Sequence, residues 1–370
     1  MTSLTVRDVV NVVDQYAPPG LAMSGDAIGL QVGRLDKPAK KVWLALDASP
    51  EVIQAAVEDE ADLLITHHAL LFRPASKIDT GTARGNAIRT ALAGDLTVYA
   101  AHTNLDIAEG GVNDVLADLF GLEDVEVLDR SQNERLRKLV VFVPESHHQA
   151  VLDALCGAGA GHIGRYSHCT FNTTGFGTFL PEEGTQPFIG QAGQMERVPE
   201  VRLETIVPER LIEPVVRAML EAHPYEEVAY DIYPLELMGK PYGLGRVGNL
   251  RHEMSLAEFA TCVKTVLGLP YIRFGGNPKL MVNRVAVLGG SGGRWVQKAI
   301  AKGAQVLVTA DCDHHVVAEA WQDGLAIVDA THASLERPVL HRLKKELESA
   351  FGETLEVTIA DVDEDPFHWV

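Results

Sequence analysis

Cysteine is scarce in this sequence: four residues occur in 370, and no two of them form a C-x-x-C pair. Disulfide frameworks and thiolate zinc sites normally show closely spaced cysteines, so neither is expected here. The sequence also opens without the basic and then apolar segments of a signal peptide. Together these absences predict a cytoplasmic protein whose thiols are all reduced.

Positive charge is scarce as well. Lys and Arg number 32 against 51 Asp and Glu, which gives a formal net charge of −19. This excess repels a phosphate backbone and anionic lipid, so we expect no nucleic-acid partner. Long hydrophobic runs are missing too, so no association with a membrane is expected. The acidic balance suits a protein that attracts cations, although a surplus of solvated carboxylates is the simpler explanation.

The sequence does contain an alternation of apolar runs and amphipathic segments. Short apolar runs at residues 42–47, 62–66 and 96–101 are separated by segments typical of helices. The same alternation resumes toward the C-terminus, with predicted strands at residues 305–310 and 325–329. Strands that alternate with helices form parallel βαβ units, so the predicted fold class is α/β, with mostly parallel sheets flanked by helices.

The pattern changes in the middle of the chain. A Val-Pro-Glu sequence occurs at residues 143–145 and again at 207–209, each time after a predicted strand and before a predicted helix. Such an internal repeat is typical of a split βαβ, ferredoxin-like module. We therefore predict that residues 134–240 form an α+β domain, inserted into a discontinuous α/β domain of residues 1–133 plus 241–370.

Histidines and carboxylates follow the C-terminal ends of several predicted strands. If these strands form one parallel sheet, all of the groups emerge at the same rim, where open α/β sheets bind their ligands. Imidazole and carboxylate groups are common ligands of transition metals. The groups are, in chain order, His67 with His68, His102 with Asp106, Asp311 with His315, and His332 with Glu336.

Five of these residues are the predicted ligands of two divalent metal ions, in a two-metal hydrolytic arrangement in which carboxylates bridge and water completes the shells. Adjacent strand residues point to opposite sides, so His67 and His68 could each serve a different ion. Ser334 is the predicted N-cap of a helix, so strict i, i+4 spacing is not assumed for the last pair. A structural histidine pair, and a capping role for Asp106, are the simpler alternatives. The predicted ligands are His67, His68, Asp106, His332 and Glu336.

The remaining groups are given supporting roles. We predict that His102 is a catalytic residue that faces the substrate and shuttles a proton, rather than a metal ligand. Asp311 and His315 are expected to support the ligands through hydrogen bonds. Residues 289–293, Gly-Gly-Ser-Gly-Gly, lack the third glycine of a dinucleotide fingerprint and the lysine of a P-loop, so a tight turn that lines the metal cleft is expected.

At these motifs the sequence resembles the NIF-three-like dinuclear-metal proteins, whose bacterial members are called GTP cyclohydrolase 1 type 2 homologues. Ala69, Ala310 and Ala333 stand where that family usually has Pro, Gly and Tyr, but none of these departures removes a ligand. The resemblance implies the same five metal ligands, a toroidal homohexamer and a PII/CutA-like inserted domain. The matching stretches are residues 29–33, 66–72, 102–106, 289–293, 309–315 and 332–336.

Two functions remain open from the sequence. One is a metal-dependent hydrolase that acts on a small, nucleotide-like or heterocyclic substrate, with GTP suggested by the family name. The alternative is a metal-binding or metal-delivery protein, or a regulatory scaffold, without turnover. Histidine and carboxylate ligands admit zinc, iron, manganese, cobalt or nickel, so the sequence does not select the metal.

Overall fold

The computed structural model describes residues 4–361 and 365–367. The chain divides into two compact units, the first made of residues 1–132 and 242–370 and the second of residues 133–241. Two long strands, β5 (Leu122–Pro144) and β8 (Tyr230–Ser255), pass from one unit to the other along the chain. The sequence predicted only short pieces of these strands. Residues 129–138 of β5 are mostly polar and none of them is buried, whereas the buried residues 243–248 of β8 include three glycines, which are unfavourable in a strand pattern.

The first unit contains a five-stranded sheet in the order β1-β4-β3-β2-β13. Its strands are parallel except for β1, which pairs antiparallel with β4. The strands are β1 (Gly29–Val32), β2 (Lys41–Ala45), β3 (Leu63–Thr66), β4 (Thr97–Ala100) and β13 (Glu356–Ile359).

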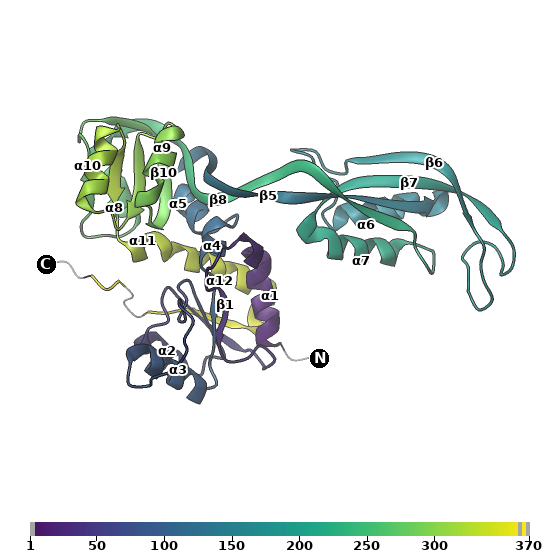
Figure 1. The fold of residues 1–370 in the computed structure, drawn as a ribbon, viewed down its shortest axis with the longest axis horizontal. Helices are drawn as coiled ribbons and strands as arrows, with labels where there is room; N and C mark the ends of the chain where they lie inside the picture. Colours follow the sequence, from purple (N-terminus) through teal and green to yellow (C-terminus); the bar gives the residue numbers. More distant parts are fainter. Residues whose placement is uncertain (1–3, 362–364, 368–370) are drawn as a thin grey trace. The chain divides into compact units, whose positions relative to one another are not determined.

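Helices cover both faces of this sheet (Figure 1). Val42 and Leu44 of β2 belong to the apolar cluster that includes one pair of helices, whereas Trp43 and Ala45 belong to the cluster of the other pair. This alternation follows from the two-residue period of a strand. The first pair is α1 (Val6–Tyr16) with α12 (Pro338–Phe351), and the second is α2 (Pro50–Glu58) with α3 (Ala83–Ala93).

Local capping signals set the starts of α1 and α2. Thr5 and Asp8 form a reciprocal capping box at the start of α1. Ser49 caps α2 through its hydroxyl oxygen, which accepts a hydrogen bond from the Val52 backbone nitrogen at 3.1 Å, and Pro50 occupies the first helical position.

The second sheet has eight strands in the order β6-β7-β5-β8-β10-β11-β12-β9, and the part β8-β10-β11-β12-β9 completes the first unit. Only the β10–β11 and β11–β12 pairs are parallel; β8 and β9 pair antiparallel at the two sides. The predicted α/β class is therefore confirmed as a mixed α/β protein with two mixed sheets, and the prediction of mostly parallel pairing holds for the five-stranded sheet but not for the second sheet. The strands that complete this sheet are β10 (Met281–Ser291), β11 (Val306–Ala310), β12 (Ala326–Asp329) and β9 (Arg273–Gly275).

Helices α8, α9 and α10 complete this part of the first unit, and they join the strands of the second sheet in the chain. Ser255 and Glu258 form a reciprocal capping box at the start of α8, the same device that begins α1. The helices are α8 (Leu256–Val266), α9 (Val296–Ala301) and α10 (His314–Gln322).

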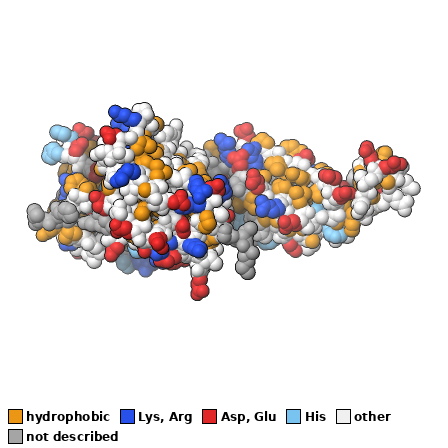
Figure 2. All heavy atoms as spheres, turned by 90° about the horizontal axis from the view of Figure 1, so that it is seen from below, with side chains coloured by type: hydrophobic (Ala, Val, Ile, Leu, Met, Phe, Trp, Pro, Cys, Tyr) orange, Lys and Arg blue, Asp and Glu red, His pale blue; other side chains and the backbone are white. Residues whose placement is uncertain are grey.

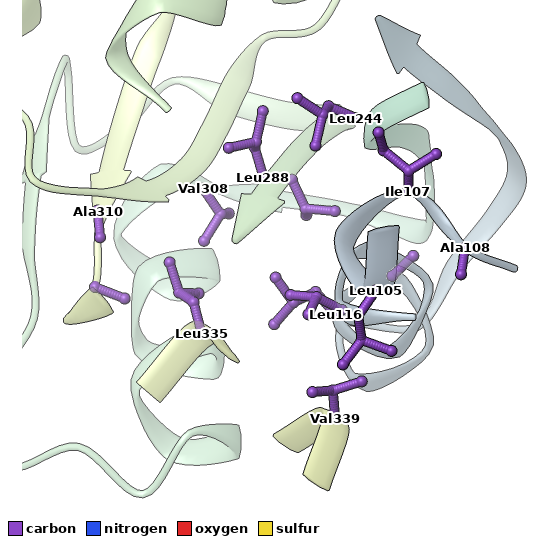
Figure 3. Packing of buried hydrophobic residues seen from close by; sticks show 14 of the residues in the cluster. Leu105, Ile107, Ala108, Leu116, Leu244, Leu288, Val308, Ala310, Leu335 and Val339 are labelled. Atoms are coloured by element: carbon purple, nitrogen blue, oxygen red, sulfur yellow. The ribbon is translucent and has the colours of Figure 1, made fainter. Parts of the chain in front are cut away.

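Three helices lie in the apolar core next to these sheets. Figure 3 shows Leu335 of α11 beside Val308 of β11, and Leu105 of α4 beside Leu116 of α5, all within one apolar cluster. Burial of a leucine side chain contributes about 1.5–3 kcal/mol, so these leucines anchor the short helices α4 and α11. The three helices are α4 (Thr103–Ile107), α5 (Val112–Leu119) and α11 (His332–Glu336).

The second unit has the element order strand, helix, strand, strand, helix, strand, and its sheet order is β6-β7-β5-β8. Both helices pack on one face of the sheet, where Val141 and Leu203 join Val151 and Met219 in a separate core. The predicted repeat is present, because β5 and β7 each end on a proline that a 3-10 turn and a helix follow. The elements are α6 (His148–Gly157), β6 (Thr170–Phe179), β7 (Glu196–Pro208) and α7 (Ile212–Ala222).

Charged side chains of both signs lie on the surface (Figure 2), and the cysteines form no disulfides. On the face drawn in Figure 2, acidic side chains are interspersed with basic and hydrophobic ones. All four cysteines are free thiols. Among the described residues, no helix combines the length and the apolar character that crossing a bilayer requires.

Candidate metal centre

The predicted ligands come together from the two sheets of the first unit. His67 and His68 follow β3 in the five-stranded sheet, whereas His332 and Glu336 lie on α11, directly after β12 of the second sheet. Asp106 lies on α4, after β4. The expectation that all of these groups emerge from one sheet was therefore wrong, because the βαβ pattern is divided between two sheets that share one core.

Helix α11 places two candidate ligands on one face. Its N-cap is Thr331, whose hydroxyl oxygen accepts a hydrogen bond from the Ser334 backbone nitrogen at 3.3 Å. The prediction of Ser334 as the N-cap was wrong, because Thr331 already caps the helix one turn earlier. His332 and Glu336 therefore have true i, i+4 spacing, and their Nε2 and Oε2 atoms are 3.1 Å apart.

Glu336 is at the middle of the cluster. Its Oε2 atom lies 3.1 Å from Nε2 of His68 and 3.7 Å from Nε2 of His67. The Oδ1 atom of Asp106 lies 3.6 Å from the same nitrogen of His67. One carboxylate oxygen thus faces three imidazoles, counting His332.

Each of the four histidines is oriented by an acceptor at its Nδ1 atom, which leaves Nε2 directed toward the cluster. This arrangement is characteristic of metal-ligating histidines, whose second ring nitrogen donates to a carboxylate or a carbonyl. The Nδ1 contacts are His67 to the Ala101 carbonyl at 3.0 Å, His68 to Asp47 at 2.9 Å, His102 to Asp26 at 2.8 Å and His332 to Asp311 at 2.7 Å.

Three buried atoms in the cluster have no hydrogen-bond partner among the described residues: Nε2 of His67, Oδ1 of Asp106 and Oε2 of Glu336. A buried polar atom left without a partner costs about 1–3 kcal/mol, so three such atoms at one place call for a ligand. A divalent cation suits them, because each atom offers a lone pair. The residues present therefore fit a metal ion.

The electrostatics of the cluster agree with this interpretation. Burial works to raise the pKa of Glu336, but the surrounding imidazoles outweigh it and the pKa lies well below its usual value. Burial raises the pKa of Asp106 to about 6. Contact with Glu336 raises the pKa of His332 to about 9. For His68, burial works to lower the pKa, but contacts with Asp47 and Glu336 outweigh it and raise the pKa to about 10. His68 and His332 therefore bind protons readily when no metal is present, and a bound metal ion would take the place of those protons.

Three sets of residues place their ligand atoms within 4.8 Å of one another and could hold a metal ion. Two of the sets share Glu336, so this carboxylate could serve two ions. The third set brings His102, which the sequence analysis did not count as a ligand, into ligand range. The sets are His67 with Asp106 and Glu336, His68 with His332 and Glu336, and His67 with His68 and His102.

The glycine-rich residues lie against this cluster, although Gly289 and Gly290 belong to the end of β10 rather than to the expected turn. Gly290 has φ +67°, and a Cβ atom there would lie 2.3 Å from Oε1 of Glu336 and 3.1 Å from Nε2 of His332. A side chain at this position would therefore collide with two of the candidate ligands. The adjacent Gly289 nitrogen donates to the Asn113 side chain at 3.0 Å, which ties the end of β10 to α5.

Two residues of the site were missed in the sequence, and one expected residue lies elsewhere. Asp47, which orients His68, ends the predicted strand beside the histidine strand, so its position was a usable signal. Asp26, which orients His102, lies before β1 in the chain and follows no predicted strand. Asp311 supports His332 as expected, whereas His315 is exposed on α10, where its ring packs against His314.

Fold and site together define a mixed α/β protein with histidine and carboxylate clusters that could bind metal ions. The chain belongs to the Duf34/NIF3 (NGG1p interacting factor 3) family, which matches residues 4–366. The resemblance seen in the motifs is thereby confirmed.

Relatives match over nearly the whole chain. A protein of Halalkalibacterium halodurans named GTP cyclohydrolase 1 type 2 homolog is 48% identical over 98% of each chain. Its namesake in Bacillus subtilis is 44% identical over 99% of this chain and 98% of its own. The crystal structure of a Bacillus cereus protein related to NIF3 superposes with a TM-score of 0.90 at 43% identity, with both chains fully covered.

Proposed function

We propose that this protein is a dinuclear-metal hydrolase that acts on a nucleotide-like or heterocyclic substrate. The observation that carries this proposal is that Nε2 of His67, Oδ1 of Asp106 and Oε2 of Glu336 are buried close together, each without a hydrogen-bond partner among the described residues. The name shared by the relatives, GTP cyclohydrolase 1 type 2 homolog, makes GTP the first substrate to test.

Two sets of residues would hold the ions, His67 with Asp106 and His68 with His332, and Glu336 would belong to both. When bound, a pair of divalent ions supplies a water of lowered pKa and polarises the group that is attacked. The ligand chemistry admits zinc, iron, manganese, cobalt or nickel.

His102 is the residue that we assign to proton transfer. Its Nδ1 atom contacts Asp26, and Thr103 donates to the same carboxylate through its backbone nitrogen at 3.0 Å. Burial opposes ionisation of Asp26, but these contacts outweigh burial and lower its pKa. An ionised Asp26 keeps the proton of His102 on Nδ1, so Nε2 is free to accept a proton beside the ligands.

A cavity of about 520 Å³ beside the cluster could admit the substrate. His68 and Asp47 line it together with Arg84 and the first residues of α2. This volume is typical of small-molecule sites. Arg84 could contact an anionic group of the substrate, but Asp47, Glu51 and Asp365 also line the cavity, so its charge by itself does not select a nucleotide over a neutral heterocycle.

The resemblance also carries proposals about assembly and the second unit. We propose that residues 133–241 form a ferredoxin-like domain of the PII/CutA type, which their strand and helix order supports. We propose further that the chains assemble into a toroidal homohexamer. Light scattering of the purified protein would then give a mass six times the 40.1 kDa of one chain, and a monomer or dimer would contradict the assembly.

The alternative, a metal-delivery protein without turnover, has one structural observation in its favour. The side chains of His68 and His332 are 26% and 36% exposed, so a bound ion would be open to exchange with solvent.

A turnover screen separates the two functions. Metal-loaded protein would be assayed against GTP, other nucleotides and phosphoesters, with products followed by chromatography. If the protein is a hydrolase, a product forms and Asp106→Ala abolishes its formation. The control is Asp118→Ala, which removes an exposed carboxylate on α5 and should leave product formation unchanged. Reversible transfer of the metal to a chelator, with no product from any substrate, would instead favour delivery.

A further inference from the structure

The second unit contains a cavity of about 570 Å³ that shares no residue with the candidate metal centre. It lies on the face of the sheet opposite α6 and α7. On β7, Leu203 and Val207 pack toward the helices, whereas Glu200 and Arg202 alternate with them and line the cavity. The connection between β6 and β7, through Pro187 and Phe188, covers part of it.

Aromatic rings form the walls of this cavity. Phe179 and Phe188 both pack near Tyr225, with ring centroids 6.0 Å and 6.3 Å from it. Phe176 also lines the cavity, and the Arg197 guanidinium carbon lies 4.2 Å from the centroid of its ring. One ring of the cavity thus already carries a cation on its face, an interaction in which the ring quadrupole attracts positive charge.

A buried carboxylate is the principal polar group of the cavity. Glu200 is only 7% exposed, and its Oε1 atom accepts a hydrogen bond from the Tyr225 hydroxyl at 2.9 Å. No described residue donates to its Oε2 atom. A Cβ atom at position 177 would lie 2.1 Å from that oxygen, so only the glycine found there leaves room for the carboxylate against β6. A buried carboxyl group among aromatic rings is well placed to pair with a cationic ligand.

The charge around the cavity excludes an anionic ligand. Glu226 and Glu227 also line it, and the one lysine or arginine among the lining residues, Arg202, is paired with Glu204. The net potential of the lining is therefore negative, which disfavours a nucleotide or a phosphate.

We propose that this cavity binds a small organic cation, an amine or a protonated nitrogen heterocycle with an apolar body. The positive group pairs with Glu200, and the apolar body packs against Phe179, Phe188 and Tyr225. Aromatic walls with a few polar groups and a volume of this size are typical of small-molecule sites. Recognition of organic cations by aromatic cages follows the same physics.

Isothermal titration of the full-length protein with three probes of matched size tests the proposal. Phenethylammonium is the cation, 2-phenylethanol the neutral analogue and 3-phenylpropanoate the anion. We expect saturable binding of one phenethylammonium per chain and no measurable binding of the anion. Glu200→Gln, which keeps the shape and removes the charge, should weaken binding of the cation by about tenfold or more. Glu213→Gln, an exposed change on α7, should leave it unchanged.

Several results would overturn the proposal. Equal binding of the anion, or equal affinity in Glu200→Gln, would exclude a cation site at this carboxylate. Loss of phenethylammonium binding after metal removal with EDTA would place the probe at the metal centre. A failure of the cation site can therefore be told apart from a failure of the proposed hydrolase. If light scattering shows that Phe176→Ser lowers the assembly mass while no probe binds, a second copy of the chain occupies the cavity. If Glu200→Gln fails to fold, Phe188→Ala tests the aromatic wall, and unchanged affinity there also contradicts the proposal.

Discussion

The Oε2 atom of Glu336 lies 3.1 Å from the Nε2 atom of His68, although the two side chains come from different sheets of the first unit. His68 follows β3, whereas Glu336 ends α11 beside the second sheet. A ligand held between these residues therefore ties the two sheets together. Binding at the centre is accordingly expected to stabilise the fold as well as to support chemistry.

Metal removal should lower the stability of the protein. A ligand that binds only the folded state stabilises it by about 2.7 kcal/mol at a concentration one hundred times its dissociation constant. We expect EDTA treatment to lower the thermal unfolding midpoint and added divalent metal to restore it. Glu336→Gln should show no such response, whereas Glu348→Gln, an exposed control on α12, should respond like the wild type. An equal response in both variants would argue against Glu336 as a ligand.

The carboxylates that orient the histidines should tune metal affinity. Asp47 and Asp311 contact Nδ1 of His68 and His332 at 2.9 Å and 2.7 Å. Substituting such a partner typically weakens metal binding by about 10–100-fold. We expect this loss in Asp47→Asn and in Asp311→Asn when metal content is titrated by mass spectrometry or calorimetry. Asp118→Asn is the matched surface control, and wild-type affinity in both test variants would contradict the assignment.

Gly290→Ala should damage the centre directly. The added Cβ atom would lie 2.3 Å from Oε1 of Glu336, at a backbone φ of +67° that alanine rarely adopts. Such strain costs about 1–3 kcal/mol, and the displaced carboxylate would lose its place between the histidines. Chemical denaturation and elemental analysis should show lower stability and lower metal content. Gly121→Ala, which has a similar φ of +65° with nothing within 4 Å, should lose stability but keep its metal.

The metal-free protein should depend on pH through His68. Asp47 and Glu336 raise the pKa of this histidine to about 10 against the opposing effect of burial. The ordinary pKa of histidine is about 6.5. A raised pKa stabilises the folded state fully below the unfolded value, and this contribution is lost as the pH rises toward 10. The stability difference between wild type and His68→Gln in EDTA should therefore shrink from pH 7 to pH 10; a difference that grows would contradict the ion pair.

The apolar anchor of α11 should matter for both stability and metal binding. Leu335 is 1% exposed and belongs to the core shared by the two sheets. Its replacement by alanine is expected to cost about 2–5 kcal/mol of unfolding free energy in urea. Metal content should fall too, because the neighbouring Glu336 loses its support. Leu92→Ala, at a leucine that is 58% exposed, should change neither quantity appreciably.

Local features of the fold were predictable because they depend on residues close together in the chain. The capping box of Thr5 and Asp8 and the N-cap at Ser49 both predict helix starts that the structure shows. The N-cap of α11 was assigned wrongly, because Thr331 and Ser334 are both good capping residues and only packing selects between them. The middle part of β5 was missed because its polar residues show no buried face, and that of β8 because its buried residues 243–248 include three glycines.

The sequence by itself determined the family, the chemistry of the candidate ligands and their positions after strands, because motifs such as residues 66–72 and 332–336 are short and local. Only the tertiary structure decided that the candidate ligands come from two sheets and that Glu336 lies among three imidazoles. It also brought in Asp26 and Asp47 as partners of His102 and His68. The physical reason is that apolar runs such as residues 62–66 and 325–329 look alike in sequence, whereas long-range packing decides which sheet each joins.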